Sequence, residues 1–311
     1  MQTPIVKMNQ NIGSANIYVK REDLLPFSFG GNKVRIAQEY YADMCKKRKN
    51  SMICYGNARS NLCRVIANIC HSRGIVCHII SPSEEDGTRI ETSNSRIARN
   101  CGAIFHPCNK NKVCEAVEDV ILECDCNGLY PYYIYGDKYG KGNESVPVRA
   151  YVKVYDEIKQ QSQHMGIQFD FIFLAIGTGM TQAGLIAGRQ LNKGSEKIVG
   201  ISVSRKKEQE LRILATFVET YFHSLGIELP LGELEIIDDY LCGGYGKYDD
   251  AIVNIIKETL IQEGMPLDPT YTGKAFYGML RTIEKEKIKG NILFIHTGGT
   301  PLFFDNIELL K

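Results

Sequence analysis

The sequence contains no tryptophan, no apolar run long enough to span a bilayer and no excess of one charge. Its 37 Lys and Arg residues nearly balance 36 Asp and Glu residues, so the net charge of +1 creates no field that would attract nucleic acid or an anionic membrane. The first ten residues lack the continuous apolar segment of a secretory signal. We therefore expect a cytoplasmic protein without nucleic-acid or membrane partners, in which any anion site is local.

The chain also lacks the paired cysteines or histidines that typify a zinc site. Its eleven cysteines are scattered, and the one close pair, Cys124 and Cys126, has no second pair or histidine near it. Cys63, Cys70 and Cys77 lie in or beside apolar stretches, where cysteine serves as a small hydrophobic residue. We expect reduced thiols and no bound metal.

What the chain does contain is a regular alternation of apolar runs and amphipathic patterns. The runs are expected to form buried strands at 52–55, 75–80, 103–105, 169–176, 198–203 and 292–295. The patterns between them predict helices at 59–71, 112–123, 208–222 and 249–262. This alternation predicts an α/β protein with parallel twisted sheets covered by helices, and its length allows two lobes. Residues 130–148, rich in Tyr, Gly, Pro and Lys, are expected to form a loop between the lobes.

A first candidate site is the segment Gly30-Gly31-Asn32-Lys33, which precedes a helical pattern at 34–44. Asn32 is a favoured N-cap and would place Lys33 in the first helical turn, where the helix dipole lowers the pKa of an amine. A neutral amine is a nucleophile. The alternative interpretation is a solvated surface lysine beside a Gly-Gly turn.

A second candidate is the turn formed by Gly177, Thr178, Gly179, Met180 and Thr181. It lies between a predicted strand and a predicted helix at 182–190, where unpaired backbone N–H groups and the helix dipole favour an anion such as phosphate. The turn is not a Walker A loop, and Gln182 replaces the third glycine of a dinucleotide fingerprint. The alternative is a tight turn that binds no ligand.

A third candidate follows the last predicted strand, at His296-Thr297-Gly298-Gly299-Thr300-Pro301. Glycines at the carboxyl end of a strand let a ligand approach the backbone closely. An imine-forming lysine, a phosphate cradle and a glycine-lined sheet edge together match what an aldehyde phosphate requires.

At this point the sequence resembles a known family, the fold-type II pyridoxal-phosphate (PLP) enzymes, which include the tryptophan synthase β chain. Within them it is similar to the D-cysteine desulfhydrase and 1-aminocyclopropane-1-carboxylate (ACC) deaminase group. The resemblance covers nearly the whole chain and rests on six motifs in the expected order: Lys20–Leu24, Gly30–Lys33, Arg59–Asn61, Gly177–Gly184, Asp268–Lys274 and His296–Pro301.

The resemblance implies a large PLP-binding domain built from residues 1–35 and 148–311, and a smaller inserted α/β domain at 36–147. It implies a Schiff base on Lys33 and phosphate binding by the 177–181 loop. It also implies a homodimer. The other implied roles are a hydrogen bond from Asn61 to the cofactor's 3′-oxygen, packing of Tyr271 against the pyridine ring, and substrate contacts from Ser60 and Tyr245.

Two positions separate the branches of this group. ACC deaminases have Glu and Leu where this chain has Thr272 and Thr297, and the two threonines match the desulfhydrase pattern. A hydroxyl near the pyridine nitrogen can donate to a neutral nitrogen, whereas a carboxylate would keep that nitrogen protonated and deepen the electron sink. The resemblance thus implies a lyase in which Lys33 removes the Cα proton of a small, D-cysteine-like amino acid, giving pyruvate, ammonia and the leaving group.

Two departures from the family leave the substrate open. Arg59 replaces the usual Gln and could pair with an anionic substrate group or with a surface carboxylate. Residues 134–140 replace a Gly-Gly-Ser-Asn loop that would face the substrate. The alternatives are ACC-deaminase-like ring opening, elimination or replacement on another amino acid, a PLP-binding protein without turnover, and a nucleotide-binding module.

Overall fold

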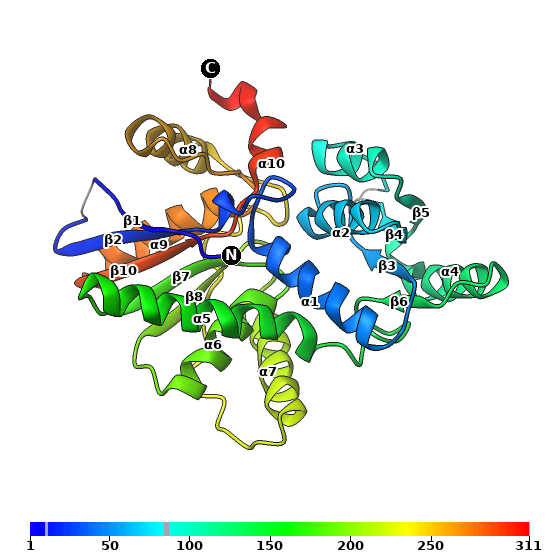
Figure 1. Cartoon of the computed structure of the whole chain (residues 1–311). Coiled ribbons are helices and arrows are strands. Elements are labelled where there is room, and N and C mark those ends of the chain that lie inside the picture. Colours follow the sequence, from blue (N-terminus) through cyan, green and yellow to red (C-terminus); the bar gives the residue numbers. More distant parts are fainter. Residues whose placement is uncertain (10–11, 84–86, 311) are drawn as a thin grey trace. The chain divides into compact units, whose positions relative to one another are not determined.

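The structure, a computed structural model, describes residues 1–9, 12–83 and 87–310. It divides into two compact units. Unit 1 comprises residues 1–32 and 148–311, and unit 2 comprises residues 33–147. Each unit has its own sheet with helices packed against it (Figure 1).

Unit 1 has a six-stranded sheet in the order β1-β2-β10-β7-β8-β9. Only β1 runs antiparallel to its neighbour, and the other pairs are parallel. The strands are β1 (Ile5–Lys7), β2 (Ala15–Arg21), β7 (Phe171–Ile176), β8 (Lys197–Ser202), β9 (Glu235–Ile237) and β10 (Gly290–His296). The helices are α5 (Ser145–Met165), α6 (Met180–Asn192), α7 (Lys207–Ser224), α8 (Asp250–Glu263), α9 (Thr272–Glu286) and α10 (Thr300–Phe304).

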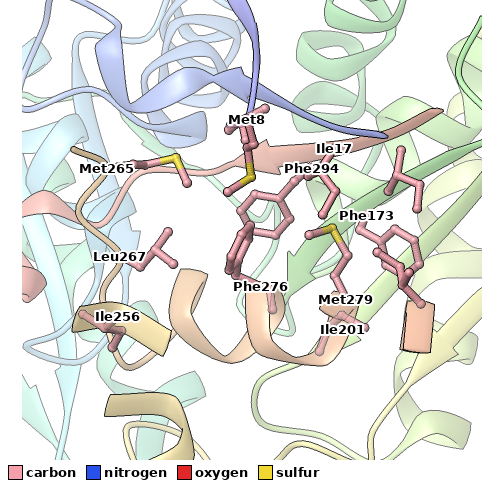
Figure 2. Packing of buried hydrophobic residues seen from close by; sticks show 14 of the residues in the cluster. Met8, Ile17, Phe173, Ile201, Ile256, Met265, Leu267, Phe276, Met279 and Phe294 are labelled. Atoms are coloured by element: carbon pink, nitrogen blue, oxygen red, sulfur yellow. The ribbon is translucent and has the colours of Figure 1, made fainter. Parts of the chain in front are cut away.

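The main core of unit 1 lies between this sheet and α8 and α9 (Figure 2). Phe276 of α9 meets Phe294 of β10 edge to face, with ring centroids 5.1 Å apart. Helix α6 covers the opposite face: a Cβ at Gly200 would meet Gln182 of α6, whereas the adjacent Ile201 meets α9 at Gly278. Successive strand residues point to opposite faces, so α6 and α9 lie on opposite faces of the sheet.

Unit 2 has a four-stranded, fully parallel sheet in the order β5-β4-β3-β6. The strands are β3 (Ser51–Tyr55), β4 (Val76–Pro82), β5 (Ile104–Cys108) and β6 (Pro131–Tyr133). The helices are α1 (Asn32–Lys46), which begins at the last residue of the unit 1 segment, α2 (Asn61–Ser72), α3 (Ser93–Asn100) and α4 (Val113–Cys126). Val117 and Val120 of α4 pack with Ile53 and Ile80 of the sheet, and α2 contacts both the sheet and α3.

The predicted α/β class with parallel sheets covered by helices is confirmed. Two local expectations are wrong. The 103–105 run belongs to an edge strand, β5, whose residues are half-buried or exposed rather than buried. The segment 130–148 is not wholly a loop, because it contains β6 and the start of α5, whose Pro147 lies in the first turn, where the missing N–H costs little.

No helix in the described residues combines the length and the apolarity needed to cross a membrane. All eleven cysteines carry free thiols, and five of them are buried: Cys54, Cys63, Cys70, Cys77 and Cys124. Within the described ranges, no group of three His, Cys, Asp or Glu side chains is placed to hold a metal ion.

Candidate active site

The start of α1 is fixed by a close approach of two glycine-containing segments of unit 1. Gly31 has φ +94°, and a Cβ there would lie 2.8 Å from the carbonyl oxygen of Thr297. The backbone N–H of Asn32 donates to that same oxygen at 3.0 Å, and Asn32 Nδ2 donates to Thr181 Oγ1 at 2.8 Å. Asn32 therefore differs from its expected capping role: it is the first helical residue, and its side chain binds the 177–181 loop instead.

Lys33 lies in the first turn of α1, as predicted. Its side chain is half-buried, and burial lowers the pKa of Lys33 from 10.5 to about 8. The ammonium form loses hydration there and also lies at the positive end of the helix dipole. A substantial fraction of this amine is therefore neutral near physiological pH, as an imine-forming nucleophile requires.

The 177–181 loop joins β7 to α6 within unit 1. Gly179 adopts a left-handed conformation and precedes the first turn of α6, whose backbone N–H groups have no partners inside the helix. The hydroxyl of Thr181 accepts from Asn32, which leaves its proton available to a ligand. A Cβ at Gly177 would lie 3.8 Å from Cε1 of Tyr271, so this aromatic ring borders the loop. The loop has the donors and the shape expected of a phosphate cradle.

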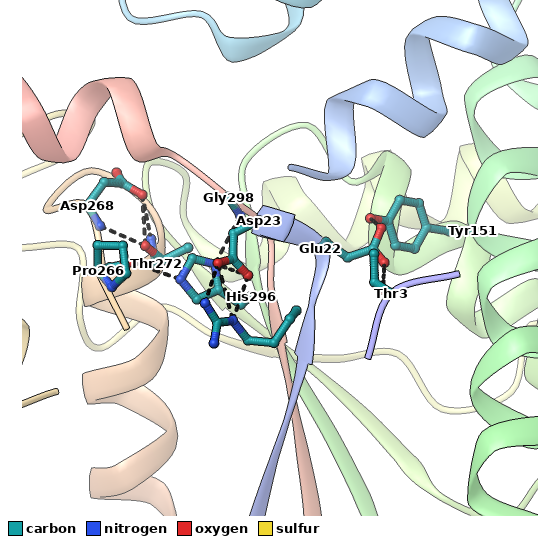
Figure 3. A network of polar contacts seen from close by, with 10 residues as sticks. Thr3, Glu22, Asp23, Tyr151, Pro266, Asp268, Thr272, His296 and Gly298 are labelled. Atoms are coloured by element: carbon teal, nitrogen blue, oxygen red, sulfur yellow. Dashed lines mark hydrogen bonds and ion pairs between the residues drawn. The ribbon is translucent and has the colours of Figure 1, made fainter. Parts of the chain in front are cut away.

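Tyr271 and Thr272 are held at the start of α9 by the buried carboxylate of Asp268. Figure 3 shows the contact between Asp268 and Thr272. Asp268 accepts the backbone N–H groups of Thr270 at 2.9 Å, Tyr271 at 2.8 Å and Thr272 at 3.1 Å. It also accepts the Thr272 hydroxyl at 2.8 Å. The expected role of Thr272 therefore needs correction: its only hydroxyl proton goes to Asp268, so it cannot also donate to a pyridine nitrogen.

Tyr245 and Tyr271 form a pair through their hydroxyl groups, which are in direct hydrogen-bond contact. Their rings lie edge to face with centroids 5.7 Å apart. The loop that carries Tyr245 is held by Lys274 of α9, whose buried ammonium donates to the carbonyl oxygens of Gly244 at 2.7 Å and Leu241 at 2.8 Å. The structure thus brings the two predicted tyrosines together and shows what positions them.

Thr297 follows β10 and is nearly buried. The preceding His296 is locked by two backbone contacts: Nε2 meets the Pro266 carbonyl at 2.8 Å, and Nδ1 accepts the Gly298 N–H at 3.2 Å (Figure 3). Because a carbonyl can only accept, Nε2 carries the proton. Asp23 lies 3.6 Å from Nδ1. His296 thereby fixes the turn in which Thr297 and the two following glycines lie.

In unit 2, the predicted residues Arg59, Ser60 and Asn61 lie at the start of α2. Ser60 is the N-cap, and its Oγ accepts the Cys63 N–H at 3.2 Å. Its own proton therefore remains available to a ligand. Asn61 Oδ1 accepts from the buried Arg64 at 2.9 Å, and the backbone carbonyl of Arg59 accepts from Asn94 at 3.0 Å.

The segment at 135–141, whose sequence differs from the family pattern, forms a closed turn. Gly136 and Gly142 are bridged, and Asp137 Oδ1 accepts the N–H groups of Tyr139 and Lys141, both at 2.9 Å. Lys138 pairs with Glu118 of α4 at 2.8 Å. The turn is therefore held by its own contacts and by α4.

Four residues that sequence reasoning did not single out support these sites: Arg64, Asn94, Asp268 and Lys274. A signal existed for Arg64, because a charged residue three positions after Asn61 on an otherwise apolar helix face has to find a buried partner. Asn94 gave no such signal, since its partners lie 30 to 35 residues away in sequence.

The sequence profile of the family described as pyridoxal-phosphate dependent enzymes matches residues 1–298. The chain belongs to this family of PLP-dependent enzymes. The predicted cofactor is thereby confirmed, as is the prediction that the chain is an enzyme. The residues described above fit the cofactor: Lys33 has the depressed pKa of an imine-forming amine, and the 177–181 loop offers a helix N-terminus and the Thr181 hydroxyl to a phosphate.

Two names occur among the relatives that this PLP-dependent enzyme resembles over nearly its whole length. A protein of Pyrococcus abyssi provisionally named 1-aminocyclopropane-1-carboxylate deaminase is 31% identical, covering 100% of this chain and 93% of its own length. A D-cysteine desulfhydrase of Yersinia pestis is 30% identical, with 97% and 92% covered. The predicted resemblance to this group is confirmed.

Solved structures agree with this family assignment. The crystal structure of an ACC deaminase homologue is 29% identical and superposes with a TM-score of 0.87, covering 100% of this chain and 93% of that chain. A hydrogen sulfide-producing enzyme from Fusobacterium nucleatum shares the fold at 17% identity and a TM-score of 0.66, with 95% and 94% covered. The fold-type II architecture is therefore confirmed.

Proposed function

We propose that this PLP-dependent enzyme catalyses α,β-elimination on a small β-substituted amino acid similar to D-cysteine. The reaction releases pyruvate, ammonia and the β-substituent, which for D-cysteine is hydrogen sulfide. The observation that carries this choice is the state of Asp268, the one carboxylate of the 268–272 turn, which accepts four hydrogen bonds from its own turn. No carboxylate of this turn is left to protonate a pyridine nitrogen, and a weak electron sink suffices when the leaving group is a good one.

The cofactor would be held by Lys33, by the backbone of Gly177, Thr178, Gly179 and Met180, and by the hydroxyl of Thr181. Asn61 would bond the 3′-oxygen and Tyr271 would cover the ring. When bound, PLP supplies the electron sink for charge that develops at Cα. We assign the hydroxyl contact with the pyridine nitrogen to Thr297, because the Thr272 hydroxyl is committed to Asp268.

The chain's own groups account for the remaining steps. Once the substrate amine has displaced it, Lys33 is an amine of pKa about 8 and can accept the Cα proton. The Ser60 hydroxyl and the first N–H groups of α2 fit a substrate carboxylate, which the positive end of the helix favours. We propose that the hydrogen-bonded hydroxyl pair of Tyr245 and Tyr271 donates the proton to the departing group.

The experiment that tests this proposal compares the release of 2-oxo acid from D-cysteine, L-cysteine and ACC by purified holoenzyme. We expect D-cysteine to be the best of the three and to release sulfide in equal amount. If ACC, which keeps all four carbons in its product, is turned over while D-cysteine is inert, the elimination proposal is wrong. Absence of turnover with a normal cofactor spectrum would support a PLP-binding protein without turnover.

Thr297 provides a sharper test of the proposed sink. Thr297→Val removes the hydroxyl at nearly constant volume and should lower kcat for D-cysteine about tenfold, in line with about 1.4 kcal/mol for one lost hydrogen bond. Thr297→Ser keeps the hydroxyl and is the matched control, with activity near that of the wild type. Equal activities of the two variants would contradict the assignment of Thr297.

One observation favours ACC ring opening as a second candidate. The Pyrococcus abyssi relative that carries the deaminase name is similar to the whole of this chain. Under that alternative a stronger electron sink is needed, so Thr272→Glu should improve ACC turnover. Under our proposal it should disrupt the Asp268 turn and destroy activity on all substrates.

We propose that Arg59 contributes to the choice of substrate, because it departs from the family next to Ser60. Arg59→Gln restores the usual residue and should raise KM or change substrate preference, with a loss of about 1.5–3 kcal/mol if a charged hydrogen bond is removed. The cofactor spectrum should be unchanged. Loss of PLP with an unaltered substrate profile would instead place Arg59 in support of the cofactor. Three further expectations stay predictions: a role of the closed turn at 135–141 in substrate choice, the homodimer and the cytoplasmic location.

A further inference from the structure

The amide of Asn61 is part of a buried network formed by α2 and α3 of unit 2. Arg64 Nη1 donates to Asn61 Oδ1 at 2.9 Å and to Asn94 Oδ1 at 2.8 Å. Asn94 Nδ2 in turn donates to Asn61 Oδ1 at 3.1 Å and to the Arg59 carbonyl at 3.0 Å. Arg64 and Asn94 are each only 1% exposed, so these contacts form away from water.

This network determines whether the oxygen or the NH₂ group of the Asn61 amide is hydrogen-bonded inside unit 2. A guanidinium has five N–H donors and no acceptor, so the atom that faces Arg64 has to be an oxygen in both asparagines. Asn94 then has its NH₂ group directed at Asn61, and this second donor also requires an oxygen there. Within the described residues of unit 2, Asn61 Nδ2 has no hydrogen-bond partner. The Asn61 NH₂ group is therefore the end left for a ligand.

We propose that Arg64 and Asn94 are positioning residues that fix the Asn61 amide with its oxygen inward and present its NH₂ group as a hydrogen-bond donor to the cofactor's 3′-oxygen. The inference rests on the proposed place of Asn61 in the cofactor site. It deepens that proposal, because it states the direction of the hydrogen bond and names the two side chains that enforce it.

The charge of Arg64 strengthens this donor. Burial lowers the pKa of Arg64 to about 10, which still leaves the guanidinium protonated at neutral pH. A cation bonded to the amide oxygen polarises the amide and makes its N–H groups better donors, an effect that is larger in a buried site. A polarised donor stabilises a deprotonated 3′-oxygen, whose protonation state is visible in the absorption spectrum of the bound cofactor.

The experiment is a double-mutant cycle on Asn61 and Asn94, with the PLP dissociation constant and the visible absorption spectrum as readouts. Asn94→Asp keeps the shape and the contact with Arg64 but can no longer donate to Asn61, and Asn94→Ala removes both contacts. We expect either variant to raise the Kd for PLP about tenfold and to shift the absorption maximum, as Asn61→Ala does. In the Asn61→Ala background the same Asn94 substitutions should change the Kd less than twofold.

Arg96→Ala, an exposed residue of α3 whose contact is Glu91, is the matched control and should leave both readouts unchanged. Thermal unfolding of the apoproteins separates a positioning role from loss of structure. The inference is overturned if Asn94→Asp keeps the wild-type Kd and spectrum, or if the effects of Asn61 and Asn94 multiply in the double variant. If Asn61→Ala itself leaves both readouts unchanged, the proposed contact of Asn61 with the cofactor is wrong. This outcome distinguishes failure of the Asn61 proposal from failure of the positioning role of Arg64 and Asn94.

Discussion

At the scale of single residues, the half-buried Lys33 is a group whose chemistry conflicts with stability. Its amine has a pKa of 10.5 in the unfolded chain and about 8 in the folded one. Between these values the unfolded state binds more protons than the folded state, so this group makes stability rise with pH. Below pH 8 the folded apoprotein has to hold a poorly hydrated cation at the positive end of α1, and its destabilising effect is then complete.

Lys33→Met should therefore stabilise the apoprotein while abolishing covalent binding of PLP. We expect a gain of about 1–3 kcal/mol in the free energy of unfolding below pH 8, since one pKa unit corresponds to about 1.4 kcal/mol. The gain should fade as pH rises from 8 toward 10.5. Urea unfolding at several pH values measures it, with Lys46→Met at the exposed end of the same helix as the control. A gain that is independent of pH would contradict the proposed cause.

Burial also lowers the pKa of Lys274, but the Lys274 ammonium, unlike that of Lys33, donates to three backbone carbonyls that hold a loop in place. Lys274→Met keeps the stem but removes the charged hydrogen bonds to the Val203, Leu241 and Gly244 carbonyls. We expect a loss of about 2–4 kcal/mol in unfolding free energy and a lower kcat, because the loop that carries Tyr245 loses its support. Lys285→Met, on the exposed side of α9, should change neither urea unfolding nor turnover. An unchanged kcat in Lys274→Met would separate the loop from catalysis.

At the scale of elements, the start of α1 depends on one glycine. Gly31 has φ +94°, and a Cβ there would lie 2.8 Å from the Thr297 carbonyl oxygen, which also accepts the Asn32 N–H. Gly31→Ala has to push these segments apart, so it should weaken PLP binding at least tenfold as well as destabilise the fold. Gly74→Ala is the matched control, because Gly74 also has positive φ but has open space around its Cβ position. Similar PLP dissociation constants for the two variants would show that backbone strain at positive φ, and not the close approach to Thr297, determines PLP binding.

The elements also show what the sequence can predict. β7 and α6 are predictable from their sequence patterns. A short continuous apolar run indicates a buried strand, and the amphipathic pattern that follows the Gly-containing turn indicates a helix. β2 was missed because its buried Lys20 carries a charge. That charge is satisfied by the Thr3 carbonyl, 17 residues away in sequence, and by Glu157, 137 residues away. α3 was missed because its eight residues are mostly polar. Its three buried residues, Asn94, Ser95 and Ala98, lie on a helix that contacts α2, which no periodicity reveals.

The candidate site divides in the same way. Residues whose role depends on backbone geometry next to them, such as Lys33 and Gly179, were predictable from local sequence. The hydrogen bond from the Thr272 hydroxyl to Asp268 could not be predicted from local sequence. Asp268 takes the one proton that Thr272 could otherwise donate to a ligand. Arg64 and Asn94 required the pairing of two helices to be known.

At the scale of the whole molecule, the eleven free thiols provide a measure of how completely the chain is folded. Five are buried, all of them in unit 2, whereas Cys45, Cys114 and Cys126 are exposed. We expect eleven thiols to react with a disulfide reagent in denaturant and the three exposed ones to react first in the native protein. The five buried thiols should react only as fast as the protein opens. Rapid reaction of all eleven in native buffer would contradict the packing described here.

Asn32, which contacts both the Thr297 carbonyl and the Thr181 hydroxyl, has a consequence for the exchange of hydrogen with solvent. Its amide hydrogen can exchange only when the contact with Thr297 opens, and the side-chain contact with Thr181 opposes that opening. A phosphate group bound at the 177–181 loop would add to this opposition. The deuterium uptake of a peptide that contains Asn32 should therefore slow when inorganic phosphate alone is added, so this single amide reports occupancy of the loop before any covalent bond to Lys33 exists.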